Sequence, residues 1–449
     1  MNRPDILFLV LDSVRPDRVS TYGHGRPTTP TLDQLAERAT VFENAYAPAP
    51  WTLPSHCSMF TGLSPSEHGI TNGFTDRSLV LPPSIETITE GLSEAGYRTA
   101  GFSNNPWVGK LSGLTRGFEE FVEWDLEVSK HSEEPIHDTV DLALSKGHSL
   151  LGHVSRQPIF LLKRRFFTSR LVERAGKWLD NVVASSEPSF TFLNLMEAHS
   201  PYFPPESSFR ELELQPPNSI EPRILNTKLL AFVLGKRDLS ADLQERVMEY
   251  YDASLRYQDR KVAELLSVLQ SHGALDDTLV VICSDHGKNL GEYDRSATPP
   301  HSLRDVNTDT LLLTKMPGQS QGRHISDPVE LARLYEILTN DSLVPREALV
   351  SEEYALTEDF IPHTGKRSTP VDRWRMLSNG TDRFMRNDSG DEYLFRDGSP
   401  IDDVTRRDEM RKGLIDRVNG LSTVGDRTDA AGEIDRNVEA QLADLGYLE

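Results

Sequence analysis

The chain has 449 residues, of which 37% are hydrophobic, so it is long enough to bury a large core in one or two globular domains. Its 69 acidic and 48 basic residues give a formal net charge of −21, which makes nucleic acid a poor partner. Two cysteines, Cys57 and Cys283, are too few for a disulfide framework or, alone, for a structural zinc site.

The length of the apolar runs in the sequence indicates where in the cell the protein is located. The run near the start of the chain, ILFLVL at residues 6–11, is too short for a signal-peptide core or a membrane span. We therefore expect a cytoplasmic protein without a transmembrane segment.

Only 12 of the 48 basic residues are lysine, and this acid-rich composition fits either a halophilic protein or an ordinary acidic protein with arginine-rich codon usage.

In chain order, buried strands and helices alternate. Continuously apolar runs indicate strands buried on both faces of a parallel sheet, and helical spacing of apolar residues indicates the connecting helices. The expected order is strand 4–14, helix 31–38, helix 84–95, strand 98–102, helix 174–183, strand 189–196, helix 249–269 and strand 278–283. The sequence therefore predicts an α/β fold in which helices cover both faces of a mostly parallel central sheet.

After residue 318 the pattern changes. Short segments between turn residues indicate an antiparallel sheet, and they lie at residues 355–360, 373–377, 384–387 and 393–397. We expect a catalytic domain over residues 1–318, with a variable insert at about 124–173, and a smaller C-terminal α+β subdomain over 319–420. Residues 421–449 are acidic and rich in Gly, Asp and Thr, as in a solvated tail with a short terminal helix.

Acidic residues directly follow two of the predicted strands. Asp12 comes after the first strand, and Asp285 and His286 come after the strand at 278–283. In sheets of this kind, ligands gather outside the carboxyl ends of the strands. Either acid alone is typical of a helix cap or a turn. Two carboxylates and an imidazole at one edge, however, supply what a divalent ion needs.

Several ordered motifs resemble the sulfatase family of the alkaline phosphatase superfamily. They are PDILFLVLDSVRPDRVSTYGHGRPTTPTLDQLAERATVFENAYAPAPWTLPSHCSMFTGLSPSEHG near the N-terminus, FLNLMEAHSPY at 192–202, and CSDHGKNLGE followed by HSLRD within 283–305. The resemblance covers most of residues 4–123 and 188–316. It implies an alkaline-phosphatase-like α/β/α sandwich and a metal-dependent enzyme that cleaves esters.

The stretch PWTLPSHCSMFTG, at residues 50–62, offers three candidate nucleophiles: Thr52, Ser55 and Cys57. In sulfatases a Cys or Ser followed at +2 by Pro and at +4 by Arg becomes formylglycine. The resemblance puts Thr52 at that position, with Pro54 and His56 in the frame, and Thr52 cannot become formylglycine. Relatives with Thr here resemble phosphodiesterases, phosphonate hydrolases and phosphoglycerol transferases, which implies that Thr52 attacks phosphorus.

The resemblance also implies a metal site, with ligands at Asp12, Thr52, Asp285 and His286. The family often has a second acid directly after the first, where this chain has Ser13. One carboxylate fewer and an imidazole make an all-oxygen calcium cage less suitable and favour Mn²⁺, while Ca²⁺, Mg²⁺ and Zn²⁺ stay open. We expect one principal divalent metal.

Matched positions also suggest substrate contacts and proton transfer. His199 and His301 match residues that contact the transferring group or protonate the leaving oxygen. Asn72, Asn105 and His56 are the expected substrate-binding residues. Asn105 lies in FSNNPW, which replaces the family's Gly-Lys-Trp-His stretch, and His56 replaces an Arg. Both departures weigh against sulfate monoester hydrolysis.

Together these observations predict a metal-dependent hydrolase or transferase that cleaves phosphate or phosphonate esters through Thr52. The expected substrate is a small-molecule ester or a glycan- or lipid-linked ester, and nucleic acid is not an expected partner. Two alternatives stay open: a sulfuric ester hydrolase without formylglycine, and a non-catalytic metal-binding relative.

Overall fold

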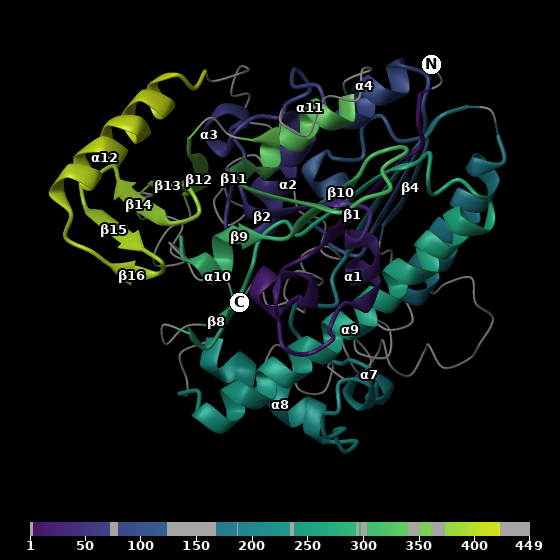
Figure 1. Ribbon diagram of the computed structural model, residues 1–449, viewed down its shortest axis with the longest axis horizontal. Coiled ribbons are helices and arrows are strands. Elements are labelled where there is room, and N and C mark those ends of the chain that lie inside the picture. Colours follow the sequence, from purple (N-terminus) through teal and green to yellow (C-terminus); the bar gives the residue numbers. More distant parts are fainter. Residues whose placement is uncertain are drawn as a thin grey trace, which may run out of the picture.

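The computed structural model describes residues 3–71, 80–123, 168–185, 187–233, 238–292, 296–297, 303–339, 349–350, 353–360 and 373–422. Within these residues a nine-stranded sheet forms the centre, and a five-stranded sheet stands to one side of it (Figure 1). The order across the large sheet is β11 (Arg323–Glu330), β2 (Thr40–Tyr46), β10 (Leu312–Lys315), β6 (Leu279–Cys283), β1 (Ile6–Leu11), β5 (Ser189–Leu195), β3 (Arg98–Ser103) and β4 (Glu120–Glu123), with β9 (Asp309–Thr310) paired to β2.

The middle of the large sheet is parallel. Strands β6, β1, β5, β3 and β4 run in one direction. Strand β10 is antiparallel to both of its neighbours, and β11 is parallel to β2. The predicted α/β fold with a mostly parallel sheet is confirmed. Because β1, β3, β5 and β6 point the same way, the residues that follow them meet at one edge of the sheet.

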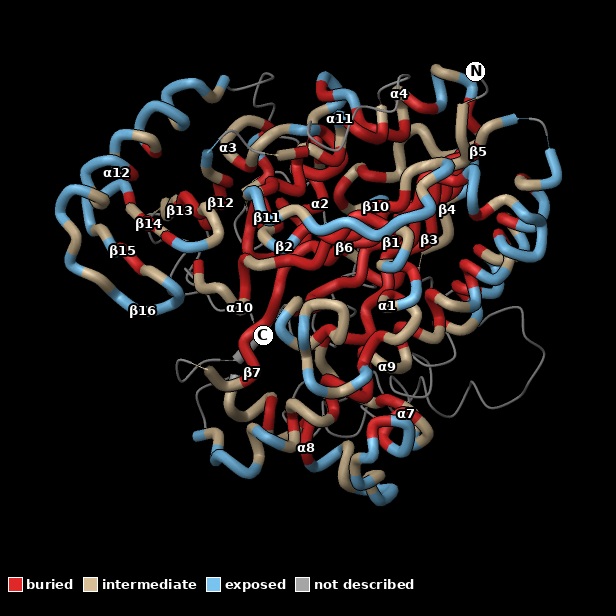
Figure 2. The backbone as a smooth tube through the Cα atoms, in the orientation of Figure 1, coloured by how far each residue is buried: buried red, intermediate tan, exposed pale blue. Residues whose placement is uncertain are grey.

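Strand β1 shows why the first apolar run becomes a central strand. All of its residues are buried, and successive side chains enter opposite cores. One core receives Leu7, Leu9 and Leu11, and the other receives Ile6, Phe8 and Val10. A strand covered on both faces needs such an unbroken apolar run. Figure 2 shows these buried strands at the centre, with the exposed segments around them.

Helices cover both faces of the large sheet (Figure 1). One face packs against α1 (Pro30–Ala36), α7 (Glu206–Glu211), α8 (Glu221–Val233), α9 (Ala241–Ser271) and the helical residues 168–183. The other packs against α2 (Thr52–Thr61), α4 (Ile88–Glu94) and α11 (Leu334–Thr339). The long helix α9 is capped by Ser240, whose hydroxyl accepts a hydrogen bond from the amide of Leu243. Its buried residues recur at helical spacing, as an amphipathic helix requires.

The five-stranded sheet near the C-terminus is antiparallel, as predicted. Its strands are β12 (Ala355–Asp359), β13 (Trp374–Ser378), β14 (Asp382–Asn387), β15 (Glu392–Arg396) and β16 (Ser399–Pro400). Helix α12 (Val404–Asn419) covers one face and inserts Met410 and Leu414 into a small core. Arg383 binds Asp309 of the large sheet through two hydrogen bonds of 2.6 Å, which fixes the small sheet to the large one.

Several short elements complete the described residues. They are α3 (Pro65–His68), α10 (Asp305–Thr308), the strand pair β7 (Asn289–Leu290) and β8 (Ser296–Ala297), and the 3₁₀ helices η1 (Pro16–Arg18), η2 (Ser20–Tyr22), η3 (Lys110–Ser112) and η6 (Leu331–Arg333). No helix in the described part of the chain combines the length and the apolar composition that a membrane crossing needs.

The predicted domain limits stay predictions. Most of the insert at 124–173 and most of the tail at 421–449 lie outside the described residues. The boundary at 318/319 falls just before β11, which pairs with β2, so the large sheet continues to Glu330.

Candidate active site

Four neighbouring parallel strands deliver the candidate site residues to one edge of the sheet. Asp12 directly follows β1, and Asn105 follows β3. His199 follows β5, and Asp285 and His286 follow β6. These side chains therefore lie at the carboxyl edge of the parallel strands, where the sequence analysis expected a ligand to bind.

Asp12, Asp285 and His286 form a compact cluster. One potential ligand atom from each residue lies within 4.8 Å of the other two. The three side chains are buried, with Asp12 and Asp285 at 0% and His286 at 2% exposure. Buried carboxylates are costly unless they are paired or bind a metal.

Ser13 links the two carboxylates. Its backbone N–H donates to Oδ1 of Asp285 at 2.9 Å, and its hydroxyl donates to Oδ1 of Asp12 at 2.7 Å. Its carbonyl oxygen accepts a hydrogen bond from the hydroxyl of Tyr251 at 2.7 Å. Ser13 has a φ of 61°, in the left-handed region that non-glycine residues rarely adopt. These three hydrogen bonds hold Ser13 in that conformation. Ser13 therefore orients the carboxylates of Asp12 and Asp285.

The ring orientation of His286 leaves one nitrogen facing the acids. Its Nδ1 lies 2.6 Å from the carbonyl oxygen of Gly287, to which it donates, so Nε2 carries the lone pair. Nε2 lies 3.4 Å from Oδ2 of Asp285. Gly287 must be glycine, because a Cβ there would lie 2.1 Å from the carbonyl oxygen of Val306. This close backbone approach holds the loop that carries His286.

Thr52 opens helix α2 beside this cluster. Its Oγ1 lies 3.2 Å from Nε2 of His286, and the residue is 1% exposed. The segment before it is fixed by the small sheet, since the hydroxyl of Thr357 donates to the carbonyl oxygen of Ala47 at 2.8 Å. The structure therefore brings together the four predicted metal ligands, which are Asp12, Thr52, Asp285 and His286.

His56 lies one turn further along α2 and is completely buried. Its Nδ1 lies 3.0 Å from the carbonyl oxygen of Thr52 and 3.5 Å from Oδ2 of Asp285. Burial lowers the pKa of His56 to about 4, so the ring is neutral at physiological pH. Its neighbour Ser55 donates to the carbonyl oxygen of Asp285 at 2.8 Å. Both contacts hold α2 against the loop after β6, and a substrate contact by His56 stays a prediction.

Asn105 is bonded at both ends of its side-chain amide. Its Nδ2 donates to Oδ2 of Asp12 at 2.7 Å, and its Oδ1 accepts the backbone N–H of Trp107 at 3.0 Å. This geometry fixes the direction of one Asp12 oxygen. Direct substrate binding by Asn105 stays a prediction.

His199 lies in the loop after β5 and is 7% exposed. Its Nδ1 donates to the carbonyl oxygen of Ser200 at 2.6 Å. Nearby, the hydroxyl of Thr168 donates to Glu197 at 2.6 Å and accepts from Asn104 at 2.8 Å. This chain of contacts ties the His199 loop to the loop after β3.

The two acids have opposite protonation tendencies. Burial and the negative charge of Asp12 raise the pKa of Asp285 well above its ordinary value. Burial also raises that of Asp12, but the charges of His199 and His286 and the Ser13 hydrogen bond outweigh it and lower the pKa. Oδ2 of Asp285 is fully buried and has no hydrogen-bond partner. An orphaned carboxylate oxygen beside a histidine lone pair fits a metal ligand set.

Two predicted residues, Asn72 and His301, lie outside the described residues. The sequence analysis gave no role to two others that the structure brings to the site. Lys288 is buried two residues after His286, and Tyr251 supports Ser13 from α9. Lys288 stands inside the CSDHGKNLGE motif, which was the available signal. No local pattern pointed to Tyr251.

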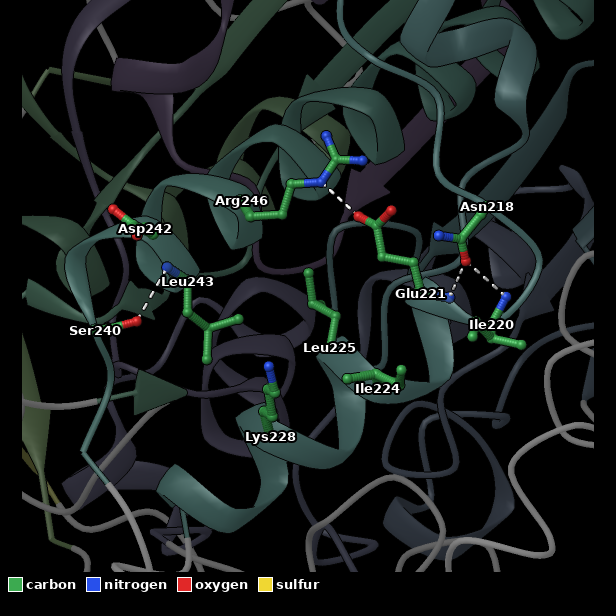
Figure 3. A pocket seen from close by; sticks show the side chains of 10 residues that line it. All are labelled: Asn218, Ile220, Glu221, Ile224, Leu225, Lys228, Ser240, Asp242, Leu243 and Arg246. Carbon is green, nitrogen blue, oxygen red and sulfur yellow. Dashed lines mark hydrogen bonds and ion pairs between the residues drawn. The ribbon is translucent and has the colours of Figure 1, made fainter.

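A separate surface pocket lies between α8 and the start of α9 (Figure 3). It has a volume of about 420 Å³ and is lined in part by Ile224, Leu243 and Lys228. An ion pair of 2.6 Å between Arg246 and Glu221 crosses its wall. None of the residues in the cluster of Asp12, Asp285 and His286 lines it, so the pocket and this candidate ligand cluster are distinct features.

Comparison with known proteins assigns the class. The family model described as Sulfatase matches residues 4–335, so the chain belongs to the sulfatase family, as the motifs predicted. The iduronate 2-sulfatase of Mus musculus is 25% identical over 394 residues, which cover 76% of this chain and 69% of that protein. The arylsulfatase of Clostridium perfringens is 25% identical over 483 residues, which cover 93% and 95%.

A solved structure supports the same fold. The phosphonate monoester hydrolase of Agrobacterium radiobacter matches with a TM-score of 0.67 at 16% identity, over 93% of this chain and 95% of that chain. At this identity the likeness establishes the alkaline-phosphatase-like fold that the sequence predicted.

Proposed function

We propose that this sulfatase-family chain is a metal-dependent hydrolase or transferase that cleaves phosphate or phosphonate esters through Thr52. The observation that carries the proposal is the 3.2 Å distance between Oγ1 of Thr52 and Nε2 of His286, inside a cluster that also contains Asp12 and Asp285. The similarity in fold to a phosphonate monoester hydrolase supports the choice of phosphorus.

The residues of the cluster suit one divalent ion. Asp12, Asp285, His286 and the hydroxyl of Thr52 would hold it, and this mixed oxygen and nitrogen set favours Mn²⁺ over Ca²⁺, with Mg²⁺ and Zn²⁺ as further candidates. When bound, such an ion lowers the pKa of the Thr52 hydroxyl and offsets negative charge on the phosphoryl oxygens.

The protein's own groups then account for the transfer. Oγ1 of Thr52 releases its proton to solvent and attacks phosphorus, and the bond from phosphorus to the leaving oxygen breaks as the new bond forms. His199 supplies a proton to the departing oxygen, and His301 shares this role. Water or an acceptor alcohol next attacks phosphorus and gives its proton back to the histidine that lost one, while the bond from phosphorus to Oγ1 breaks and Oγ1 regains a proton from solvent. Ser13 and Asn105 keep the carboxylates oriented throughout.

Sulfate esters are the second candidate class of substrate. Relatives about a quarter identical to this chain are named for sulfatase activity, among them the iduronate 2-sulfatase and the arylsulfatase. Thr52 stands against this class, because a threonine side chain cannot become the formylglycine that sulfatases use.

The acid-rich, lysine-poor composition further supports a salt-adapted protein.

A substrate panel with an acid quench tests the proposal. The protein, loaded with Mn²⁺, is assayed on aryl phosphate monoesters, aryl phosphodiesters, aryl phosphonates and aryl sulfates. We expect turnover of at least one phosphorus ester, and peptide mass spectrometry should find a phosphoryl or phosphonyl group on Thr52. Modification of Ser55 or Cys57 instead, or turnover of the sulfate ester alone, would contradict the proposal.

A further inference from the structure

Lys288 is a buried cation in the loop that carries two of the candidate metal ligands. It lies two residues after His286 and is 3% exposed. Lysine is rarely buried to this extent unless its ammonium has polar or charged partners. The catalytic steps proposed for Thr52 and the histidines do not use it.

The ammonium of Lys288 faces the loop that carries His199. Its Nζ donates a hydrogen bond of 3.1 Å to Oγ of Ser200 and lies 5.9 Å from the ring centroid of Tyr202. The carbonyl oxygen of the same Ser200 accepts the Nδ1 hydrogen bond of His199. Lys288 therefore packs against the segment whose histidine is expected to serve the leaving group.

Lys288 connects two loops of the candidate site. Its backbone belongs to the loop that carries His286, and its ammonium is hydrogen-bonded to the loop that carries His199. Water and salt screen the charge of a buried ammonium poorly. The interaction of Lys288 with a bound ligand therefore depends strongly on the charge of that ligand.

The backbone of Lys288 is held in place. Nη1 of Arg15 donates to its carbonyl oxygen at 3.2 Å. Arg15 is itself fixed by ion pairs with Asp17 at 2.7 Å and Glu292 at 2.6 Å. These contacts fix the backbone of the loop at Lys288, and the hydrogen bond to Ser200 holds the ammonium.

A count of charges suggests what the ammonium binds. With a divalent ion bound, both Asp12 and Asp285 would be ionised, and their two negative charges would leave the site close to neutral. Near neutral pH a phosphate monoester carries close to two negative charges, because its second pKa is about 6. A phosphodiester or a phosphonate monoester carries one. We propose that Lys288 is a specificity-determining residue that pairs with the additional charge of a phosphate monoester. This inference rests on the proposed function and names its substrate class.

Two variants of Lys288 and one control variant test whether the charge of Lys288 selects the substrate. Lys288→Met removes the charge, Lys288→Arg keeps it, and Lys261→Met removes another buried lysine that pairs with Glu264 at 2.7 Å on α9. At equal metal content, Lys288→Met should lower kcat/KM at least tenfold more for an aryl phosphate monoester than for the matching diester. Lys288→Arg should restore most of the loss, and Lys261→Met should not discriminate between the two esters. Equal losses for both esters in Lys288→Met would overturn the inference.

Binding of inorganic phosphate to the metal-loaded protein gives a second readout that does not need turnover. Calorimetry should find phosphate binding at least tenfold weaker in Lys288→Met than in the wild type, with unchanged metal stoichiometry. Unchanged affinity, undetectable binding in the wild type, or loss of metal in Lys288→Met would each overturn the inference. If the wild type cleaves no phosphorus ester, the proposed function fails, and this measurement still decides the role of Lys288. Should Lys288→Met not fold, Lys288→Gln carries the same expectations.

Discussion

Oγ1 of Thr52 lies 3.2 Å from Nε2 of His286, a residue 234 positions later in the chain. The contact joins the first residue of α2 to the loop after β6. Because Nδ1 of His286 donates to the carbonyl oxygen of Gly287, Nε2 accepts the hydrogen bond from the Thr52 hydroxyl. The candidate nucleophile is therefore held beside the two buried acids.

Thr52→Ala should abolish nearly all esterase activity without unfolding the protein. Loss of a covalent nucleophile typically lowers kcat by about 10³-fold or more. Thr52→Ser keeps a hydroxyl and should retain part of the activity. The control is Ser55→Ala, which removes a hydroxyl bonded to the carbonyl oxygen of Asp285 but no nucleophile. Steady-state kinetics and a melting curve of each variant check this, and full activity in Thr52→Ala would refute a Thr52 nucleophile.

Asp285→Asn should lower both metal content and activity, because the change replaces a carboxylate oxygen that lacks any hydrogen-bond partner and is a candidate metal ligand. Elemental analysis of the purified variant measures the metal. Asp276→Asn is the matched control, since the side chain of Asp276 is 74% exposed and pairs with Arg38. Equal metal stoichiometry in Asp285→Asn and the wild type would count against this site.

Asn105→Ala should weaken metal binding by about 10- to 100-fold, the usual effect of removing a residue that orients a ligand. The reason is the 2.7 Å hydrogen bond from Nδ2 of Asn105 to Oδ2 of Asp12. Asn104→Ala is the neighbouring control, because Asn104 donates to Thr168 instead. Metal titration of the apoprotein followed by calorimetry compares the two. An affinity equal to that of the wild type would show that Asn105 does not orient Asp12.

Asp259 should make stability fall as the pH rises. Burial raises the pKa of Asp259 from 3.8 to about 6, against hydrogen bonds from Thr31 and Leu32 that lower it. The stabilisation by its neutral form is complete below 3.8 and is lost as the pH passes through 6. At about 1.4 kcal/mol per pKa unit, the wild type should lose about 2 kcal/mol relative to Asp259→Asn between pH 4.5 and 7.5. Urea unfolding at both pH values measures this, and a constant difference between the two proteins would contradict it.

Added salt should stabilise the wild-type protein. Its formal net charge of −21 causes self-repulsion in the compact state, and salt screens that repulsion. The melting temperature should rise between low and molar KCl. A flat or falling melting temperature over that range would remove the basis for a halophilic protein.

Much of the fold and the core of the site follow from local sequence patterns. The apolar run of β1 and the helical spacing of α9 each specify one element, because side-chain periodicity reports the faces that are buried. The rule that parallel strands present their carboxyl ends at one edge then brings Asp12 together with Asp285 and His286. Elements with weak patterns were not foreseen. Only Met410 and Leu414 of α12 are buried, and only the last two residues of β11 are buried.

The finer geometry of the site depends on contacts between residues far apart in the chain. Ser13 adopts its left-handed backbone and bridges two acids because Asp285 and Tyr251 bind it from other elements. Lys288 is buried where the loop after β5 packs against it, through the hydrogen bond to Ser200. The sequence determined which residue types stand at the ends of which strands, since that information is local. Which atoms face one another was decided by tertiary packing, because burial and hydrogen-bond partners arise only when distant segments meet.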